Sequence, residues 1–225
     1  MKLNVVHQED YSRFELLLRS FLGFLYIAIP HGFILFFLYI WSAILQFLTF
    51  WIILFTGRFP ESFFEYQLKL KRWNFRVNAR LYHLSDDYPR FGLDAEDDHI
   101  EYDVPYLENP SRGLVLLRAL LGWLYVWIPH GFILFFLNIA ASFVAFVAWF
   151  IVLFTGKYPP ELFNFMNNYL KYNERVGLYM AYMVDVYPPF SLSAEGYEVE
   201  VARRAGVYEE DTEEKKNNFK DTDLV

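Results

Sequence analysis

Two long stretches of the chain, residues 21–55 and 120–154, contain no charged side chain, and each is followed by an amphipathic stretch. Uncharged apolar runs of this length are typical of helices that cross or insert into a membrane. The amphipathic stretches place apolar residues three and four positions apart, as on one face of a helix. After the first run this apolar stripe comprises Phe63, Tyr66, Leu70, Trp73, Val77, Leu81 and Leu84. The pattern predicts a mostly helical membrane protein.

The chain contains the same unit twice. Residues 13–94 align with residues 112–193 without a gap, and the segment Pro30–Leu38 recurs letter for letter as Pro129–Leu137. An internal repeat fixes the architecture before any single element is placed. We therefore divide the chain into a first membrane unit (1–94), an acidic linker with a short strand (95–111), a second membrane unit (112–193), and a short strand followed by a disordered charged tail (194–225).

Each unit is expected to begin with a short strand. Alternating apolar residues predict a strand over 100–106, and the corresponding N-terminal stretch is 3–7. A similar stretch, 198–201, follows the second unit. Three strands that pair at the membrane surface, or three extended linkers, are both compatible with this pattern.

A helical break is expected at Pro30-His31-Gly32 and at Pro129-His130-Gly131. Ser12 and Ser111 can cap the preceding helical runs. Proline removes a backbone donor and glycine permits a sharp bend, so we predict that the chain reverses there. The segment that follows, 33–55, is about 35 Å long as a helix and can cross a hydrocarbon core of about 30 Å. The predicted fold is an all-α membrane protein of tandem helical hairpins broken at Pro-His-Gly, each followed by an amphipathic interfacial helix.

The distribution of charge favours one orientation. The net charge is −7, but the acids gather in the linker and the tail, and no basic nucleic-acid footprint is present. Cytoplasmic loops of membrane proteins carry the excess of Lys and Arg. If only 33–55 and its equivalent crossed, the two units would face opposite ways. Hairpins keep every basic cluster on one side, so we expect both termini to be cytoplasmic.

Several motifs recur in order in both units and resemble a known family. They include Ile-Pro-His before the long helix, Thr-Gly-Arg or Thr-Gly-Lys after it, and Asp-x-Tyr-Pro-x-Phe at the close of each unit. The chain resembles, over 3–94 and 100–193, the bacterial membrane proteins grouped as domain-of-unknown-function family 4389. Arg90 stands where the family pattern prefers proline. The resemblance implies a bacterial integral membrane protein of the inner membrane and brings no activity with it.

The residues at the helix break are the first functional candidates. An ionisable side chain at membrane depth is a functional hypothesis by default. Neither His31 nor His130 has an acidic residue, a cysteine or a second histidine within helical reach. A structural role, bonding carbonyls freed by proline, is therefore favoured over proton relay or metal binding. The candidates are Pro30, His31, Gly32, Pro129, His130 and Gly131.

A second candidate set lies on the amphipathic helices. An Asn-x-Arg-Val motif is present in both units, and a basic helix beside a membrane segment usually lies against anionic lipid headgroups. A stripe packed on protein, or a solvated face, is the alternative. The candidate contacts to lipid or to an acidic partner are Arg72, Arg76, Arg80, Lys171 and Arg175.

Polar residues within the long apolar runs do not match between the units. Helix packing explains them better than a conduction path, which duplication would have repeated. They are Ser42, Gln46, Thr49, Asn138 and Ser142.

No catalytic or cofactor motif is present. The chain has no cysteine, and the linker acids lack the spacing of a metal loop. We expect no catalytic residue, no metal and no cofactor, and a protein that is not an enzyme. The leading hypothesis is a membrane scaffold or accessory subunit that binds other membrane subunits or itself. The alternative is a small transporter, channel or lipid-moving protein that uses the helix break.

Overall fold

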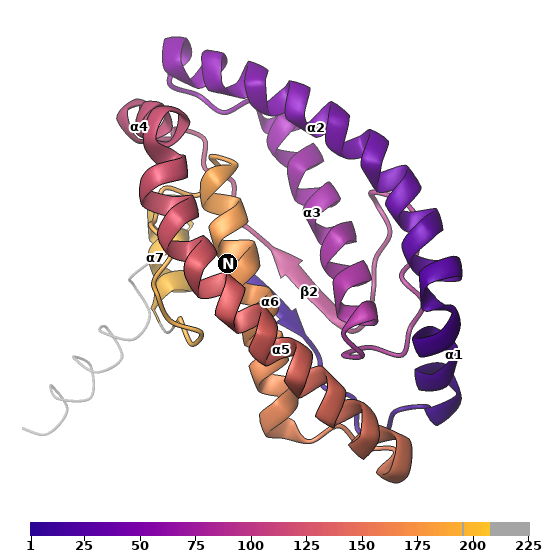
Figure 1. Ribbon diagram of the computed structural model, residues 1–225. Helices are drawn as coiled ribbons and strands as arrows, with labels where there is room; N and C mark the ends of the chain where they lie inside the picture. The colour runs from indigo at the N-terminus through magenta and orange to yellow at the C-terminus, as the bar shows by residue number, and fades with distance from the viewer. Residues whose placement is uncertain (195, 208–225) are drawn as a thin grey trace, which may run out of the picture.

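The computed structural model describes residues 1–194 and 196–207 (Figure 1). The elements in chain order are β1 (Lys2–Val5), α1 (Arg13–Gly23), the π-helix η1 (Phe24–Ala28), α2 (Ile29–Thr56), α3 (Glu61–Leu81), β2 (Ile100–Asp103), α4 (Arg112–Gly122), the π-helix η2 (Trp123–Trp127), α5 (Ile128–Thr155), α6 (Pro160–Met180) and α7 (Tyr197–Arg204). The mostly helical fold, the tandem repeat and the two short strands at the unit starts are confirmed.

The three helical segments at the start of each unit form one long, bowed helix. These helices, Arg13–Thr56 and Arg112–Thr155, are 44 residues each and are long and apolar enough to cross a membrane. Ser12 and Ser111 cap them as expected, because their Oγ atoms accept hydrogen bonds from backbone amides in the first turn at 3.3 and 3.4 Å.

The predicted reversal at Pro-His-Gly is wrong. A five-residue π-helix ends just before Pro30 and another just before Pro129, and the helix then continues. The π turn shifts the hydrogen-bond register and so accommodates a residue without an N–H. The chain turns instead at Gly57 and Gly156, whose φ angles of 77° and 75° are left-handed. The hairpin of each unit is therefore α2 with α3, and α5 with α6.

Helices α3 and α6 lie in the centre of the molecule rather than at an interface with lipid. Leu70, Trp73 and Val77 of the predicted stripe are buried, whereas Leu81 is exposed. Phe75, on another face of α3, is also buried, because it packs against Tyr102 of β2. The predicted position of these helices at the membrane interface is therefore corrected. Both helices are covered by protein, which was the alternative that the sequence left open.

The two strands pair antiparallel, with Leu3 opposite Tyr102. The third predicted strand is wrong, because the segment around 198–201 is helical in α7. Its buried residues, Tyr197 and Val201, are four apart, while Val199 between them is exposed. This spacing places one helical face on the core. Residues 202–204, expected to begin the disordered tail, belong to α7, and 208–225 lie outside the described residues.

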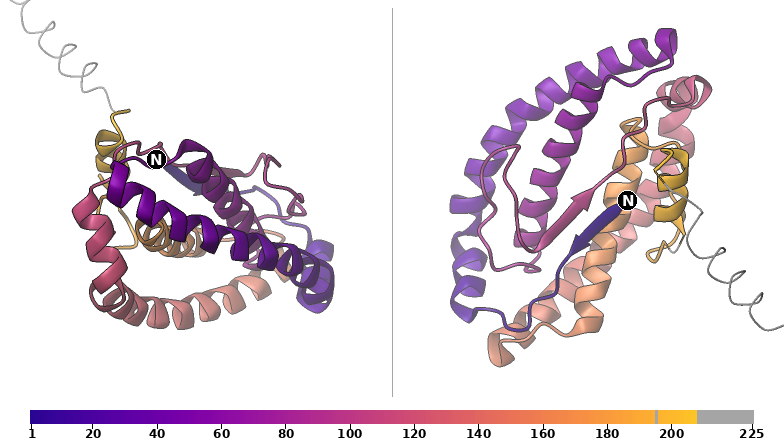
Figure 2. Two further views of the ribbon diagram at one scale, coloured as in Figure 1. Left: turned by 90° about the horizontal axis from the view of Figure 1, so that it is seen from above. Right: turned by 180° about the vertical axis from the view of Figure 1, so that it is seen from behind.

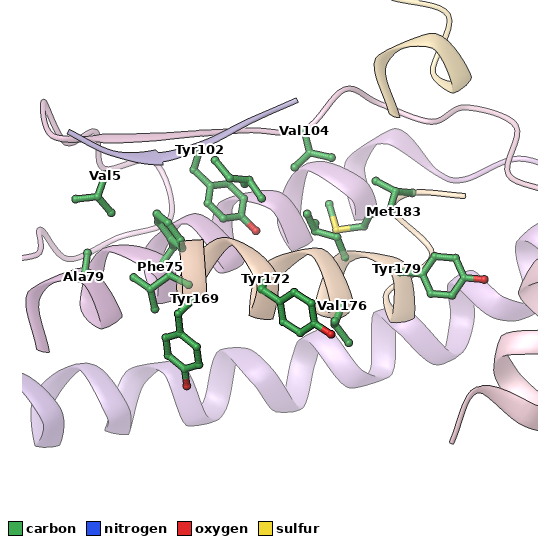
Figure 3. Packing of buried hydrophobic residues seen from close by; sticks show 14 of the residues in the cluster. Val5, Phe75, Ala79, Tyr102, Val104, Tyr169, Tyr172, Val176, Tyr179 and Met183 are labelled. Carbon is green, nitrogen blue, oxygen red and sulfur yellow. The ribbon is translucent and has the colours of Figure 1, made fainter. Parts of the chain in front are cut away.

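The two units interlock around an approximate two-fold axis. Strand β1 begins the first unit but packs on α6 of the second, where Asn167 Oδ1 accepts a hydrogen bond from Val5 N at 3.1 Å. Strand β2 in turn packs on α3, where Arg72 Nε donates to Tyr102 O at 3.0 Å. One hydrophobic core therefore runs through both units (Figure 3).

Only a narrow stripe of each long helix is buried. On α2 this stripe comprises His31, Leu35, Ser42, Leu45, Thr49 and Ile53. Large apolar side chains cover the remaining surface, and many are exposed at equivalent positions in both units. They include Phe33, Phe36, Phe37, Ile40, Phe47 and Phe55, and Phe132, Phe135, Phe136, Ile139, Phe146 and Phe154.

Candidate functional site

The first histidine site is formed by His31, Trp73 and Phe91. His31 lies in the first turn of α2 and is fully buried. Its Nδ1 atom accepts a hydrogen bond from the indole Nε1 of Trp73, on α3, at 3.0 Å. Phe91, from the loop that closes the unit, stacks on the imidazole with ring centroids 4.0 Å apart. The side chain therefore joins three segments of the unit.

The second histidine site is formed by His130, Tyr172 and Phe190. His130 is also fully buried, and its Nδ1 atom lies 2.7 Å from the hydroxyl of Tyr172. Phe190 stacks on the ring at a centroid distance of 4.5 Å. These residues are the exact repeat counterparts of the first site, with tyrosine in place of tryptophan. Duplication has preserved the imidazole, a hydrogen-bond partner from the central helix and the stacked phenylalanine.

The hydrogen bond from Trp73 fixes the state of His31. Indole can only donate, so Nδ1 of His31 has a free lone pair and the proton of the neutral ring lies on Nε2. The Nε2 atoms of both histidines are buried and make no hydrogen bond to a described residue. Each imidazole thus contacts the central helix through Nδ1 and the closing loop through its ring face.

A second repeated arrangement joins the start of each long helix to the end of its unit. Asp86 accepts hydrogen bonds from Ser12 N at 2.5 Å and from Arg19 Nη2 at 2.9 Å. In the second unit Asp185 accepts from Ser111 N at 2.6 Å and pairs with Arg118. We call these the Arg–Asp pairs. Both arginine side chains are buried.

The histidine sites and the Arg–Asp pairs lie within the segments that match a known family. The family model described as domain of unknown function 4389 matches residues 19–92 and 116–191. The chain belongs to domain-of-unknown-function family 4389. No curated protein and no solved structure matches the chain. Each of the two family 4389 segments runs from the arginine region to the stacked phenylalanine.

The prolines of the two Pro-His-Gly motifs begin a helix in the family 4389 units, whereas the glycines make no close contact. Pro30 and Pro129 stand in the first turn of α2 and α5, directly after the π-helices. A Cβ atom added to Gly32 or Gly131 would meet nothing within 4 Å. Neither glycine is needed for packing or for a turn, so the motif is centred on its histidine.

Arg76 and Arg175 lie inside the protein and not against lipid headgroups. Both are 2% exposed. Arg76 donates to the carbonyl oxygens of Ala95 and, at 3.0 Å, of Gly92. Arg175 donates to Ser191 O at 2.8 Å and Leu192 O at 3.1 Å. Burial lowers the pKa of both guanidinium groups. The expected lipid contact is therefore corrected for these two residues: they fix the loop that closes each unit.

Arg80 is likewise buried and forms an ion pair with Glu15. The equivalent residues in the second unit are Tyr179 and Leu114. Both members of the pair have changed together, and the ring of Tyr179 there lies 4.5 Å from the guanidinium of Arg118. Alignment of the two repeats shows this paired replacement, and from it the contact between Arg80 and Glu15 could have been predicted.

Arg72 and Lys171 are the two basic candidates that remain near the surface. Both are half-buried. Arg72 holds β2, as described above, while Lys171 lines a surface hollow with Asn168 and Glu198. Burial lowers the pKa of Lys171.

The unmatched polar residues of the long helices make packing contacts. Ser42 Oγ donates to Gln67 Oε1 at 2.6 Å. Gln46 Nε2 donates to Met180 O at 3.0 Å and so joins the two units. Asn138 Nδ2 donates to Tyr169 OH at 3.0 Å. These contacts agree with the packing role expected from the absence of repetition.

One cluster of metal-ligand type is present among the described residues. Asp87, Asp97 and His99 bring their ligand atoms within 4.8 Å of one another, and His99 Nδ1 lies 2.5 Å from Asp87 Oδ2. Asp87 lies outside the linker, so spacing within the linker did not reveal it. The second unit has Val186 and Gly196 at the positions of Asp87 and Asp97, so the cluster is not part of the repeated architecture.

Proposed function

We propose that the protein is a non-enzymatic membrane scaffold or accessory subunit that associates with a larger membrane assembly or with itself. The observation that carries this proposal is the contrast between its inner and outer surfaces. The repeated polar side chains, at the histidine sites and Arg–Asp pairs, make their contacts inside the protein. The outer surface of both long helices is a broad apolar face available to lipid or to another membrane protein.

The proposed location is the bacterial inner membrane, with both termini cytoplasmic. Two long apolar helices support membrane association. Arg72 and Lys171 are the candidate contacts to anionic lipid headgroups, because they are the basic candidates closest to the surface.

Partner association can be tested on the protein extracted with its native lipid. The full chain would be extracted into polymer-bounded lipid discs, and the mass of the purified particle would be measured by native mass spectrometry. We expect a homo-oligomer or a defined complex that survives extraction. A single chain with no protein partner at several expression levels would contradict the scaffold proposal.

A hollow between the units supports a second candidate, a small lipid- or ion-moving protein. It encloses about 330 Å³ and is lined by Ser42, Gln46, Gln67 and Lys71 together with apolar residues of both units. Flux through reconstituted vesicles separates the two proposals. Flux that is lost both in Lys71→Met and in the double variant His31→Ala, His130→Ala would favour transport. Absence of flux with ions and labelled lipids would favour the scaffold.

A further inference from the structure

We propose that the protein does not cross the bilayer but lies within one leaflet, with its long helices along the membrane plane and its sheet facing water. This inference rests on the proposed membrane function and specifies its lipid partner, the acyl-chain region of a single leaflet. The arguments come from the length of the apolar face, the position of the charged residues and the arrangement of the layers.

The apolar face of each long helix is longer than a bilayer is thick. The uncharged run 21–55 is about 52 Å long as a helix, against a hydrocarbon core of about 30 Å. To cross the bilayer with this whole run inside the hydrocarbon core, a straight helix would have to tilt by roughly 55° from the membrane normal. This exceeds the usual range of tilt angles of transmembrane helices. A helix that lies along the membrane plane has no such limit.

Charged side chains stand beside the middle of α2, on the side opposite its apolar face. Gln67 of α3 contacts Ser42, near the middle of α2, and Glu65, two residues before Gln67, is exposed. Lys69 pairs with Asp94 at 2.7 Å, and the side chain of Asp94 is 81% exposed. If α2 crossed the bilayer, these charges would lie in the hydrocarbon core, where ionised groups are costly.

The layers of the molecule separate the two kinds of surface. The strands lie on one side of α6 and a long helix lies on the other (Figure 3). In the views from above and behind, the sheet and α7 lie on a different side of the molecule from α5 (Figure 2). Glu101 and Asp103 of β2 are exposed. An apolar layer for lipid and a charged layer for water therefore extend across the molecule.

The repeat supports the same orientation. Antiparallel strands and interlocked units relate the two long helices by an approximate two-fold axis. If that axis runs along the membrane normal, both units lie at one depth and keep all basic clusters on one side. If the helices cross, the axis lies in the membrane and the two units are inverted. Embedding in one leaflet thus satisfies the charge distribution without a reversal of the chain at Pro-His-Gly, which the structure does not show.

Equivalent positions in the two units give a direct test. Arg58 and Lys157 are exposed, and each follows the end of a long helix. Single-cysteine variants R58C and K157C of the full chain would be treated with a membrane-impermeant maleimide in sealed cells and in opened membranes. We expect both to be labelled from the same side. Labelling from opposite sides would overturn the proposal while leaving membrane association intact.

Depth measurements provide an independent test. The exposed positions F36C, F47C, F135C and F146C would carry a spin label in vesicles of phosphatidylethanolamine and phosphatidylglycerol. Embedding predicts similar, shallow depths at all four. A crossing helix would separate F36C from F47C by about 16 Å along its axis. If the chain does not float with vesicles, the proposed membrane function itself is contradicted. If it floats but the label depths differ, only the orientation in one leaflet is contradicted.

Discussion

At each histidine site a neutral imidazole joins the start of a long helix to the central helix and to the loop that closes the unit. The hydrogen-bond partner of Nδ1 is Trp73 in one unit and Tyr172 in the other. Duplication has therefore conserved the histidine while its partner has diverged. A partner of either kind satisfies a buried nitrogen that would otherwise be desolvated without compensation.

Removal of the hydrogen-bond partner of one histidine should lower the free energy of unfolding by a small amount. Trp73→Phe and Tyr172→Phe each leave Nδ1 of a buried histidine without its hydrogen bond. We expect the loss of about 1–3 kcal/mol of unfolding free energy per variant, with tryptophan at the upper end because its ring is larger. Urea unfolding in detergent would measure this. Unchanged stability in both variants would contradict the role assigned to the histidines.

His83 should make stability depend on pH. Burial, with Arg19 and Arg80 nearby, lowers the pKa of His83 to about 3, against 6.5 in the unfolded chain. The folded state therefore excludes a proton that the unfolded state binds. The contribution of the neutral ring is fully present above pH 6.5 and is lost as pH falls from about 6.5 towards 3, at up to about 1.4 kcal/mol per pH unit.

The matched variant for this prediction is His83→Asn. His83 has a left-handed φ of 64°, which asparagine tolerates better than most residues. Carboxylates also titrate in this range, so the quantity of interest is the difference between the two proteins. Parallel stability profiles between pH 7 and pH 4 would contradict the assignment.

At the scale of elements, substitution of glycine should change stability in opposite ways at the two turns and at the two Pro-His-Gly motifs. Gly57 has a φ of 77°, and a Cβ atom there would lie 2.8 Å from Arg112 Nη2. Gly57→Ala should therefore destabilise by about 1–2 kcal/mol. Gly32→Ala should be neutral or stabilising by up to about 1 kcal/mol, because the site is open and helical. Thermal unfolding of both variants checks this. A loss of stability in Gly32→Ala alone would support the bend that the sequence predicted at Pro-His-Gly.

The Arg–Asp pairs should contribute more to stability than the surface ion pairs. Asp86→Asn and Asp185→Asn each leave a buried arginine without its carboxylate, at an expected loss of about 3–5 kcal/mol. Asp94→Asn is the control, because it breaks an exposed pair with Lys69 and should cost less than about 1 kcal/mol. Equal losses at all three positions, by urea unfolding, would contradict the distinction.

At the scale of the whole molecule, the exchange of strands makes the two repeats one folding unit. Asn167 accepts from Val5 N and donates to Asn4 Oδ1 at 2.7 Å, across the boundary between the units. Asn167→Ala leaves a buried amide unsatisfied, and we expect a loss of about 1–3 kcal/mol. Hydrogen exchange should then increase in β1 and β2 together. An increase confined to α6 would contradict the coupling of the units.

The sequence by itself determined the repeat, the helical content, the serine caps and the family, whereas it left strands and extended linkers as alternatives at the unit starts. These follow from local spacing and from the comparison of equivalent positions, such as Ser12 with Ser111. The repeat also marked His31 and His130, although it did not show their partners. Those partners, Trp73 and Phe91 in the first unit, are distant along the chain and come together only when the closing loop folds back.

Only the tertiary structure decided where the chain turns and which surfaces are covered. Proline and glycine at residues 30 and 32 permit a break, but a π turn absorbs the proline and the helix continues. The arginines of α3 look like a solvated face by composition, yet Arg76 and Arg80 are buried. Arg76 contacts the closing loop, and Arg80 contacts that loop and Glu15 of α1. The spacing of apolar residues identifies one apolar face of a helix. It does not identify a second, basic face that is buried because carbonyl and carboxylate groups distant in the sequence bind it.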